Sequence, residues 1–399
     1  MRSDDHAVGS AERRYEGKVL AVLGASLFQV PLILRAQELG CAVHAFAIPA
    51  DDVGEQIADV FHPVSTADRE EVLRICREIG ADGVCTIGSD FNNVVATWVA
   101  NQMGLPANSD TCAHLSSDKH AMREAFAAAG DPSPRSIPVR KGEDLPAVVD
   151  ELRFPLIVKP SDRSGSRGIT RVTSASELGC ALEAAWDVSF AGIALIEEFL
   201  EGDEFSVECI SWKGSHTILQ VTRKFTTGAP SFIETGHIEP PLLSEEVVAH
   251  IKEVVSHALT TLQVQQGAAH AEVKVDEDGS IGIVEIGSRM GGDFIGSDLV
   301  TLSTGIDFIG DVVDCALGFA PDLVPHSQPK AAAVRFVLSV EDATALEQLK
   351  ASRPDMIVRA DWEEPDGAQV TDSSTRFGYA VLAAERVDEL LPWLPEVRH

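Results

Sequence analysis

Hydrophobic and polar positions follow two different patterns along the first hundred residues. Short apolar runs of strand length are followed by longer stretches with apolar residues every three or four positions, which is the spacing of an amphipathic helix. Three of these stretches stop at a glycine, Gly40, Gly80 or Gly104, a common helix end. The pattern predicts strands over 19–23, 42–48 and 83–87 and helices over 29–39, 69–79 and 93–103.

Strands that alternate with helices predict a parallel sheet. We therefore expect a Rossmann-like α/β domain over residues 17–115, preceded by a polar, flexible tail at 1–16. The first strand leads into Gly24-Ala25-Ser26, which lacks the G-x-G-x-x-G pattern of dinucleotide-binding proteins. This domain is therefore predicted to be a scaffold whose strand-end loops could still face a ligand.

After Asp118 short strands and helices mix, and a mostly β stretch over 204–238 precedes a helix and a hairpin. From residue 330 a predicted strand and helix are typical of a small cap. The expected fold class is thus α/β and α+β: the Rossmann-like domain, an α+β domain over 116–329, and a C-terminal α+β subdomain over 330–399.

The predicted hairpin lies between residues 269 and 287, around the turn residues Asp278-Gly279. A loop from Asp276 to Gly279 would pair Val275 with Ser280 and His270 with Glu285, which puts Glu272 and Glu285 on one face. A loop one residue longer or shorter would send the two carboxylates to opposite faces. The other face would carry Val273, Val275, Val284 and Ile286. Taken alone, an ordinary hairpin with two solvated glutamates is about as probable as a metal and phosphate site.

Two further segments carry candidate chemistry. Lys159 ends an apolar strand, and the loop Ser164-Gly165-Ser166-Arg167-Gly168 follows, with glycines that can turn backbone amides toward a phosphate. The loop is not a Walker A motif, and a plain surface turn is the alternative. The second segment, 196–204, runs from a strand into an acidic turn, which could present backbone groups to adenine and a carboxylate to ribose.

Composition narrows the class of protein. The 399 residues carry a formal net charge of −30, with a pI near 4.6, which argues against nucleic acid and anionic membranes as partners. The seven cysteines are scattered without C-x-x-C spacing, which favours reduced thiols and a cytoplasmic location. The sequence shows no signal peptide and no apolar run of membrane-spanning length, so we expect no membrane partner.

The order of these motifs resembles the ATP-grasp superfamily over residues 18–330. The resemblance implies ATP and Mg²⁺ (or Mn²⁺) as cofactors, with the nucleotide between two α+β subdomains, one of them a mobile lid. Lys119 and Lys159 would contact phosphates, and Glu272 and Glu285 would hold the metal. The lid loop would comprise Ser164, Gly165, Ser166 and Gly168; Glu197 and the backbone of Glu198 and Leu200 would face adenine, Glu204 the ribose, and Ile157 and Ile283 the adenine slot.

One position departs from the family pattern. Many members have Glu-x-Asn-Pro-Arg at the second metal carboxylate, whereas this chain has Glu285-Ile286-Gly287-Ser288-Arg289, so Gly287 supplies no oxygen. With Glu234-Thr235-Gly236-His237 upstream, the variant looks most like the L-amino-acid ligases that make dipeptides. The resemblance implies that His237 and Arg289 flank the reacting carbonyl. The alternative for His237 is a structural histidine.

Two acids near this site raise the question of substrate charge. Asp293, together with Glu234, would favour a substrate with a cationic amine. Alternatively, Asp293 caps a helix over 294–302.

Three functions are consistent with the sequence. The first is an ATP-dependent carboxylate–amine ligase that acts through an acyl phosphate on small molecules, with amino acids as substrates. The second is a purine-pathway or carboxylase-type ligase, and the third is a nucleotide-binding regulatory protein without turnover. The sequence leaves the substrates and a homodimer open.

Overall fold

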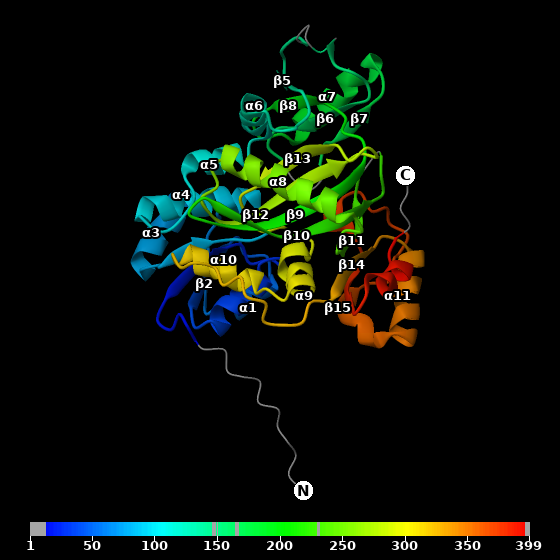
Figure 1. Cartoon of the computed structure of the whole chain (residues 1–399). Helices are drawn as coiled ribbons and strands as arrows, with labels where there is room; N and C mark the ends of the chain where they lie inside the picture. Colours follow the sequence, from blue (N-terminus) through cyan, green and yellow to red (C-terminus); the bar gives the residue numbers. More distant parts are fainter. Residues whose placement is uncertain (1–12, 146–148, 150, 164–166, 230–231, 396–399) are drawn as a thin grey trace.

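The computed structural model describes residues 13–145, 149, 151–163, 167–229 and 232–395. Within these residues the strands form one parallel sheet of four strands and two antiparallel sheets, of eight and four strands. The predicted combination of α/β and α+β architecture is confirmed. In Figure 1 the parallel sheet lies at the lower left, the large sheet in the middle, and the small antiparallel sheet at the top.

The N-terminal sheet has the order β3-β2-β1-β4, flanked by helices. The predicted strands and helices are all present, with ends that differ by up to three residues. The short α2 and the edge strand β3 were not predicted, because β3 has no buried position and gives no hydrophobic signal. The elements are β1 (Val19–Leu23), α1 (Val30–Glu38), β2 (Ala42–Ala47), α2 (Val53–Ile57), β3 (Val60–Pro63), α3 (Arg69–Ile79), β4 (Gly83–Cys85) and α4 (Asp90–Met103).

The large sheet has the order β13-β12-β9-β10-β11-β14-β16-β15. The C-terminal residues therefore extend the central sheet through β14 and carry α11 and α12 on it. Its strands are β9 (Asp203–Trp212), β10 (Ser215–Thr226), β11 (Glu234–Glu239), β12 (Gln266–Val275), β13 (Ile281–Gly287), β14 (Ala331–Val337), β15 (Ile357–Trp362) and β16 (Gly378–Ala384), with helices α11 (Val340–Ser352) and α12 (Val387–Leu390).

The small antiparallel sheet has the order β5-β8-β6-β7. Together with α7 we call it the lid subdomain; α5 and α6 connect it to the N-terminal domain. These elements are α5 (Asp110–Leu115), α6 (Lys119–Ala129), β5 (Ser136–Arg140), β6 (Leu156–Pro160), β7 (Thr170–Val172), α7 (Leu178–Val188) and β8 (Ile193–Glu198).

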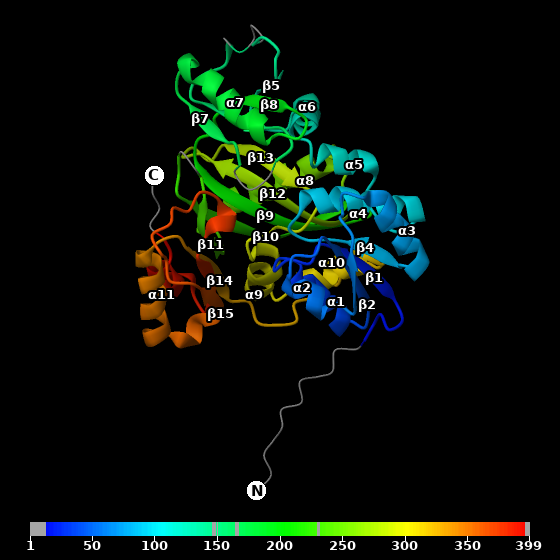
Figure 2. The ribbon, with the colours of Figure 1, turned by 180° about the vertical axis from the view of Figure 1, so that it is seen from behind.

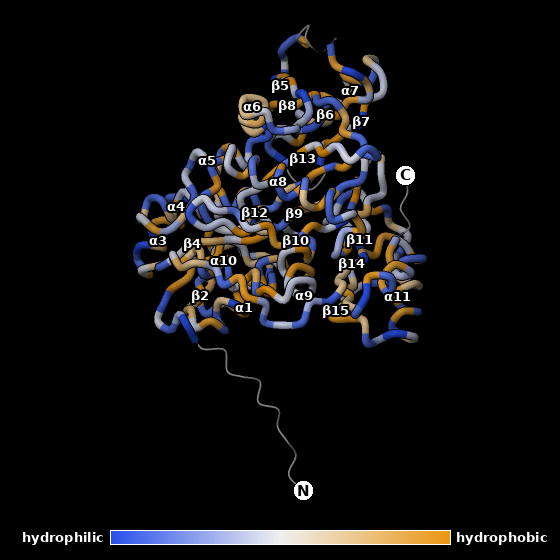
Figure 3. The backbone as a smooth tube through the Cα atoms, viewed as in Figure 1, coloured by the Kyte–Doolittle hydropathy of each residue, from blue (hydrophilic) through white to orange (hydrophobic). Residues whose placement is uncertain are grey.

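Two helices after the lid subdomain tie the parts together. The α8 helix (Glu245–Thr261) covers one face of the central sheet, where its buried side chains join those of β9, β12 and β13. The α10 helix (Phe308–Ala316) shares a hydrophobic core with α1, β1 and β2, so the N-terminal sheet packs directly on the central domain. Figure 2 shows α10 between the two from behind, and Figure 3 shows hydrophobic residues gathered in the interior strands. Between residues 13 and 395, leaving out the undescribed gaps, no helix is both long and apolar enough to cross a membrane.

Candidate active site

A cavity of about 150 Å³, which we call the lid cavity, lies between the lid subdomain and the β12–β13 hairpin. Its walls come from α6, β6 and β8 on one side and from β9, β10, β12 and β13 on the other. The structure thus brings together residues predicted from four separate segments of the chain. They are Lys119, Lys159, Glu197, Glu198, Leu200, Glu204, Glu272 and Glu285.

A buried charge cluster forms one end of this cavity. Glu197 is 2% exposed and receives Lys159 Nζ at 2.6 Å and Arg123 Nε at 2.8 Å. Burial alone would raise the pKa of Glu197, but the two cations outweigh it and lower the pKa to about 2. Burial lowers the pKa of Lys159, and Glu197 opposes that effect. Both cations therefore bind the Glu197 carboxylate in the structure without a nucleotide.

Lys119 begins α6, whose first turn is capped by the Asp118 side chain. Its Nζ lies 2.9 Å from Glu285 Oε2 and donates to the Arg163 carbonyl oxygen at 3.1 Å. Burial would lower the pKa of Lys119, but the Glu285 carboxylate raises it above its ordinary value. The ammonium stays charged and lies beside a predicted metal ligand.

The two hairpin carboxylates face each other, but in a register that differs from the prediction. Val275 pairs with Ile281 instead of Ser280, because the turn is one residue longer than expected. That change alone would separate the two carboxylates. A β-bulge at Val284 restores their shared face by inserting one extra residue, so that Glu272 lies directly opposite Glu285.

The bulge also corrects two smaller predictions. Val284 lines the lid cavity instead of packing in the core, whereas Ile283 is fully buried in the core and does not line the adenine slot. Ile157 does line the lid cavity, as expected. Because of the inserted residue, Val284 faces the lid cavity and Ile283 faces the core, the reverse of the predicted arrangement.

Lys224 on β10 binds Glu272, the other carboxylate that is predicted to hold the metal. Its Nζ lies 2.7 Å from Glu272 and from Glu204, and 3.9 Å from Glu234. Burial would lower the pKa of Lys224, but these carboxylates hold it well above its ordinary value. Lys224 therefore neutralises a cluster of acids that would otherwise repel one another.

The residues present fit a magnesium ion only in part. Carboxylate oxygens are ligands that Mg²⁺ prefers, and Glu272 and Glu285 supply them from opposing strands. Among the described side chains no group of three or more His, Cys, Asp or Glu residues could hold a metal ion. A Mg²⁺ ion here would therefore need phosphate oxygens and water to complete its six ligands.

The structure explains the glycine at position 287. A Cβ there would lie 2.7 Å from Asp90 Oδ1, because Asp90 reaches across from α4. Asp90 binds the Arg289 guanidinium through two hydrogen bonds, at 2.7 Å from Nε and 3.0 Å from NH2. The space of the family's asparagine is thus occupied by an acid of the N-terminal domain, which orients Arg289.

A second cavity, of about 250 Å³, shares Lys224, Glu234 and Glu272 with the lid cavity. We call it the interdomain cavity, because its lining comes from all parts of the chain. It brings His237, Arg289, Glu234 and Asp293 together. The other lining residues include Phe28, Gly88 and Asp90 of the N-terminal domain, Arg167, His270, Ile295, and Ser373 of the C-terminal subdomain.

His237 is fully buried on β11, and its ring meets Phe336 edge-on at 5.7 Å between centroids. Neither ring nitrogen has a hydrogen-bond partner among the residues that the structure describes; the nearest acid, Asp293, is 3.9 Å away. Burial lowers the pKa of His237, so the imidazole is neutral at pH 7. A buried, unsatisfied donor and acceptor in a cavity wall is costly unless a ligand or water binds it.

His270, on β12, was not predicted as a site residue. Its Nδ1 makes a short contact with the fully buried Glu208, and Nε2 lies 3.5 Å from Glu272 Oε1. Glu208 also accepts the Gly291 N–H at 3.1 Å, and a Cβ at Gly291 would overlap with both His270 and Glu208. The Glu208–His270 pair therefore holds the backbone at Gly291, between Arg289 and Asp293, in place.

The two predicted substrate acids each have a partner in the C-terminal subdomain. Ser373 Oγ donates to Glu234 Oε2 at 2.6 Å. Arg376 binds both oxygens of Asp293, at 2.6 and 2.9 Å. The capping role considered for Asp293 is wrong, because the following η3 segment (Ile295–Leu299) begins after Phe294 and has no side-chain cap.

Three of the predicted lid residues, Ser164, Gly165 and Ser166, lie outside the described residues. Gly168 has a left-handed backbone, φ +70°, and a Cβ there would lie 2.6 Å from Val188 Cγ2. It therefore packs on α7 instead of lining the lid cavity. Arg167 beside it lines the interdomain cavity, whereas Arg163 and Ile169, on either side of the loop, line the lid cavity.

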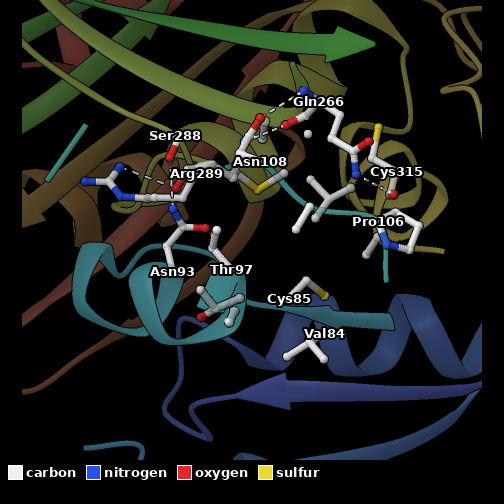
Figure 4. A pocket seen from close by; sticks show the side chains of 18 residues that line it. Val84, Cys85, Asn93, Thr97, Pro106, Asn108, Gln266, Ser288, Arg289 and Cys315 are labelled. Carbon is white, nitrogen blue, oxygen red and sulfur yellow. Dashed lines mark hydrogen bonds between the residues drawn. The ribbon is translucent and has the colours of Figure 1, made fainter. Parts of the chain in front are cut away.

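A smaller cavity of about 70 Å³, shown in Figure 4, lies behind Arg289. Asn93 from α4 donates to Ser288 Oγ at 3.0 Å, and Ser288 also bonds Ser116 at 2.7 Å. Figure 4 shows Asn93 and Ser288 pointing toward each other beside Arg289. The space suits a few water molecules, and its polar lining fixes the backbone that carries Arg289.

The site residues that the sequence did not predict contact predicted residues that are far from them in the sequence. Arg123 has a local signal, since it lies one helical turn after Lys119 and so shares its face of α6. Lys224 alternates in phase with Thr222 and Thr226 on β10 and gives no such signal. Asp90 and Arg376 are about 200 and 80 residues from their partners, and no local pattern joins them.

Residues 152–298 match the ATP-grasp domain family. Alanine–anticapsin ligase of Bacillus subtilis (strain 168) is 29% identical over 245 residues, which cover 56% of this chain and 51% of that protein. D-alanine–D-alanine ligase of Actinobacillus pleuropneumoniae serotype 5b (strain L20) is 28% identical over 212 residues, covering 51% of this chain and 68% of that protein. The chain spans about half the length of the alanine–anticapsin ligases that it matches.

Two solved structures resemble the whole chain. L-amino acid ligase from Bacillus licheniformis superposes with a TM-score of 0.79 at 25% identity, covering 95% of this chain and 96% of that one. Phosphoribosylglycinamide synthetase from Anaerococcus prevotii reaches 0.74 at 21% identity over 94% and 96%, which shows the common fold alone. The chain therefore contains an ATP-grasp domain over residues 152–298, as the order of its motifs indicated.

Proposed function

We propose that the protein is an ATP-dependent carboxylate–amine ligase that activates an amino acid as an acyl phosphate and joins it to an amine. The observation that carries this proposal is the wall shared by the two cavities. Lys224, Glu234 and Glu272 line both the lid cavity and the interdomain cavity. A nucleotide in the first cavity can therefore present its terminal phosphate to a carboxylate in the second.

ATP would bind in the lid cavity with its phosphates toward Lys119 and Lys159. The backbone of Glu198 and Leu200 would meet adenine, next to Ile157 and Val284. Mg²⁺ held by Glu272 and Glu285 would supply positive charge to the phosphate oxygens. The lysines stabilise the charge that spreads over the transferred phosphoryl group.

In the first step an oxygen of the substrate carboxylate attacks the γ-phosphorus, and the bond from that phosphorus to the ADP oxygen breaks. Closure of the lid over this step excludes water, which would otherwise hydrolyse the acyl phosphate. The described residues supply no nucleophile to the reaction, because the carboxylate itself is the attacking group.

In the second step the amine nitrogen attacks the acyl carbon, and phosphate leaves with the carbon–oxygen bond pair. Arg289 is held by Asp90 in the wall of the interdomain cavity, and its charge would stabilise the oxygen that becomes negative in this step. His237 is neutral and has an unpartnered ring nitrogen, so it can accept the proton that the amine loses.

The two other candidate functions have weaker support. A phosphorylated purine-pathway substrate needs a cluster of basic side chains for its phosphate. In the described lining of the interdomain cavity Lys224 and Arg289 are paired with carboxylates, and Arg167 adds one further cation. A regulatory role without turnover would not need an unsatisfied histidine beside Arg289.

ADP release tests the proposal. Purified protein with ATP and Mg²⁺ is given single amino acids and pairs of amino acids, and products are identified by mass spectrometry. Amino-acid-dependent ADP release with a matching amide product supports the proposal. ADP release that depends on a phosphoribosyl amine, or no release with any amino acid, would contradict it.

A further inference from the structure

The chain between β15 and β16, residues 363–377, crosses from the C-terminal subdomain to the interdomain cavity. Its ends are fixed by backbone hydrogen bonds, Glu363 N to Phe377 O and Phe377 N to Val337 O, both 2.9 Å. Asp372 caps its short η5 helix (Ser373–Thr375). We call this segment the C-terminal strap. It lies outside residues 152–298, the part that matches the ATP-grasp domain.

Arg376 of the strap is held on every side. Its Nε donates to the Ser373 carbonyl oxygen at 2.7 Å, and its two terminal nitrogens bind Asp293. Its guanidinium carbon lies 3.6 Å from the centre of the Phe336 ring, and the side chain is only 7% exposed. Such a desolvated, two-point ion pair holds its geometry well.

Asp293 needs this support for its backbone as well as its charge. Asp293 and Phe294 have φ values of +51° and +66°, which are strained for residues with a Cβ. Phe294 packs on Tyr379 with ring centroids 4.1 Å apart, so β16 fixes one half of the turn and Arg376 the other. The turn directly follows the segment that carries Arg289.

The strap also changes the charge that a substrate meets. Within the described lining of the interdomain cavity, Asp90 is paired with Arg289, Glu272 with Lys224, and Asp293 with Arg376. Glu234 accepts a hydrogen bond from the Ser373 hydroxyl, and Lys224 Nζ lies 3.9 Å from it. Each of these four acids thus has a cation within 4 Å, which weakens the negative potential that a substrate side chain meets.

We propose that the C-terminal strap selects the amino-acid substrate by charge, with Arg376 as a specificity-determining residue that cancels Asp293 and so favours neutral side chains. This inference rests on the proposed ligase function. Loss of Arg376 would uncover the Asp293 carboxylate and improve substrates with a cationic side chain. Loss of the Asp293 charge would uncover Arg376 and improve anionic ones.

The test compares kcat/KM for lysine, alanine and glutamate in amino-acid-dependent ADP release. Arg376→Gln keeps a polar side chain at this position but removes the charge, and should raise the lysine-to-alanine ratio by about tenfold or more. Arg376→Lys should keep the wild-type ratio. Adding Asp293→Asn to Arg376→Gln should return the ratio to its wild-type value, an outcome that a merely structural role does not produce.

Arg359→Gln is the matched control. Arg359 stacks on the same aromatic group, 4.8 Å from the Phe294 ring centre, and pairs with Asp298 at 2.5 Å, but it does not line the cavity. Its loss should lower stability without changing the ratio.

Two results would overturn the inference: an unchanged lysine-to-alanine ratio in Arg376→Gln, or an equal change in Arg359→Gln. Should Arg376→Gln fail to fold, Asp293→Asn alone decides, because it should raise the glutamate-to-alanine ratio and an unchanged ratio would refute the proposal. Absence of amino-acid-dependent ADP release in the wild type would count against the ligase function instead.

Discussion

The lid cavity and the interdomain cavity share a wall but are built in different ways. The lid cavity is lined by residues between 119 and 285, contributed by two sheets that face each other. The interdomain cavity takes its lining from the N-terminal domain, the central sheet, the lid loop and the C-terminal strap. The lining of the interdomain cavity can therefore vary with these peripheral segments, whereas that of the lid cavity depends mainly on the two sheets.

The two regions also treat a buried glutamate in opposite ways. Glu197, at the lid cavity, has two cationic partners, which overcome burial and lower its pKa to about 2. Glu239, on β11 two residues after His237, is fully buried. Among the described residues its carboxylate accepts hydrogen bonds from the hydroxyls of Ser303 and Thr222, and burial raises its pKa to about 8. Glu197 is therefore an ionised partner of two cations, whereas Glu239, near His237, keeps its proton at neutral pH.

Removing one metal carboxylate should have the largest effect on activity. Glu272→Gln or Glu285→Gln keeps the shape of the hairpin but halves the negative charge of this carboxylate pair, so ADP release should fall by about 10²–10³-fold. The measurement is ADP release as a function of Mg²⁺ concentration.

Glu277→Gln is the control for this pair, since it makes the same change in the exposed turn of the same hairpin. Near-normal ADP release in both site variants would show that the carboxylates do not hold the metal.

His237→Asn should affect the reaction in the interdomain cavity without affecting ATP binding in the lid cavity. It removes a proton acceptor from the interdomain cavity, so kcat should fall by about 10²-fold while ATP binding stays unchanged. ATP binding is measured by the shift in melting temperature on adding ATP, and kcat by amide formation. His250→Asn, on the exposed side of α8, is the control. An equal loss of ATP binding would mean that His237 supports the fold instead of the reaction.

Gly168→Val tests whether the lid loop is needed for ATP binding and for coupling ATP hydrolysis to amide formation. The left-handed backbone and the contact with Val188 should together cost on the order of 1–3 kcal/mol. We expect a KM for ATP raised by roughly tenfold, or ATP hydrolysis without amide formation.

Gly142→Val is a matched control, because Gly142 also has a left-handed backbone, φ +88°, but nothing lies within 4 Å of a Cβ there. In the wild type, trypsin cleavage after Arg163 and Arg167 should slow on adding a non-hydrolysable ATP analogue. Equal cleavage with and without the analogue would argue against lid closure.

The smallest expected effect is the dependence of stability on pH that Glu197 and Glu239 produce. Glu197 has a lowered pKa, so its ion pairs stabilise the fold above about pH 4.5 and are lost as the pH falls toward 2. Glu239 has a raised pKa, so the folded protein keeps a proton that the unfolded chain releases, and stability should fall as the pH rises from about 4.5 to 8.

Thermal unfolding across this pH range measures both slopes. Glu239→Gln should flatten the slope between pH 4.5 and 8 and leave the acid slope unchanged. If Glu239→Gln and the wild type had the same slope of stability between pH 4.5 and 8, Glu239 would not be the group that titrates there.

The fold was predictable from local patterns to a large extent. Helix ends at Gly80, Gly104 and Gly130 have the left-handed backbone that only glycine adopts readily, so sequence and structure agree there. Edge strand β3 escaped prediction, because a strand without a buried face has no hydrophobic periodicity.

The site was predictable where a motif lies in one strand or helix, as for Lys119, Lys159 and Glu197. It was not predictable where geometry depends on a bulge, since Val284 could not be identified as the inserted residue from alternation alone. Pairs such as Asp293 with Arg376 depend on how distant segments dock. No rule of spacing contains that information.

The contact between Asp90 and Gly287 has a consequence for the history of the chain. Position 90 belongs to the N-terminal domain and position 287 to the hairpin, yet they compete for one volume. A relative with a side chain at 287 should lack the acid at 90 and needs another partner for its arginine. Exchange of N-terminal domains between relatives should therefore succeed only when positions 90, 287 and 289 are inherited together.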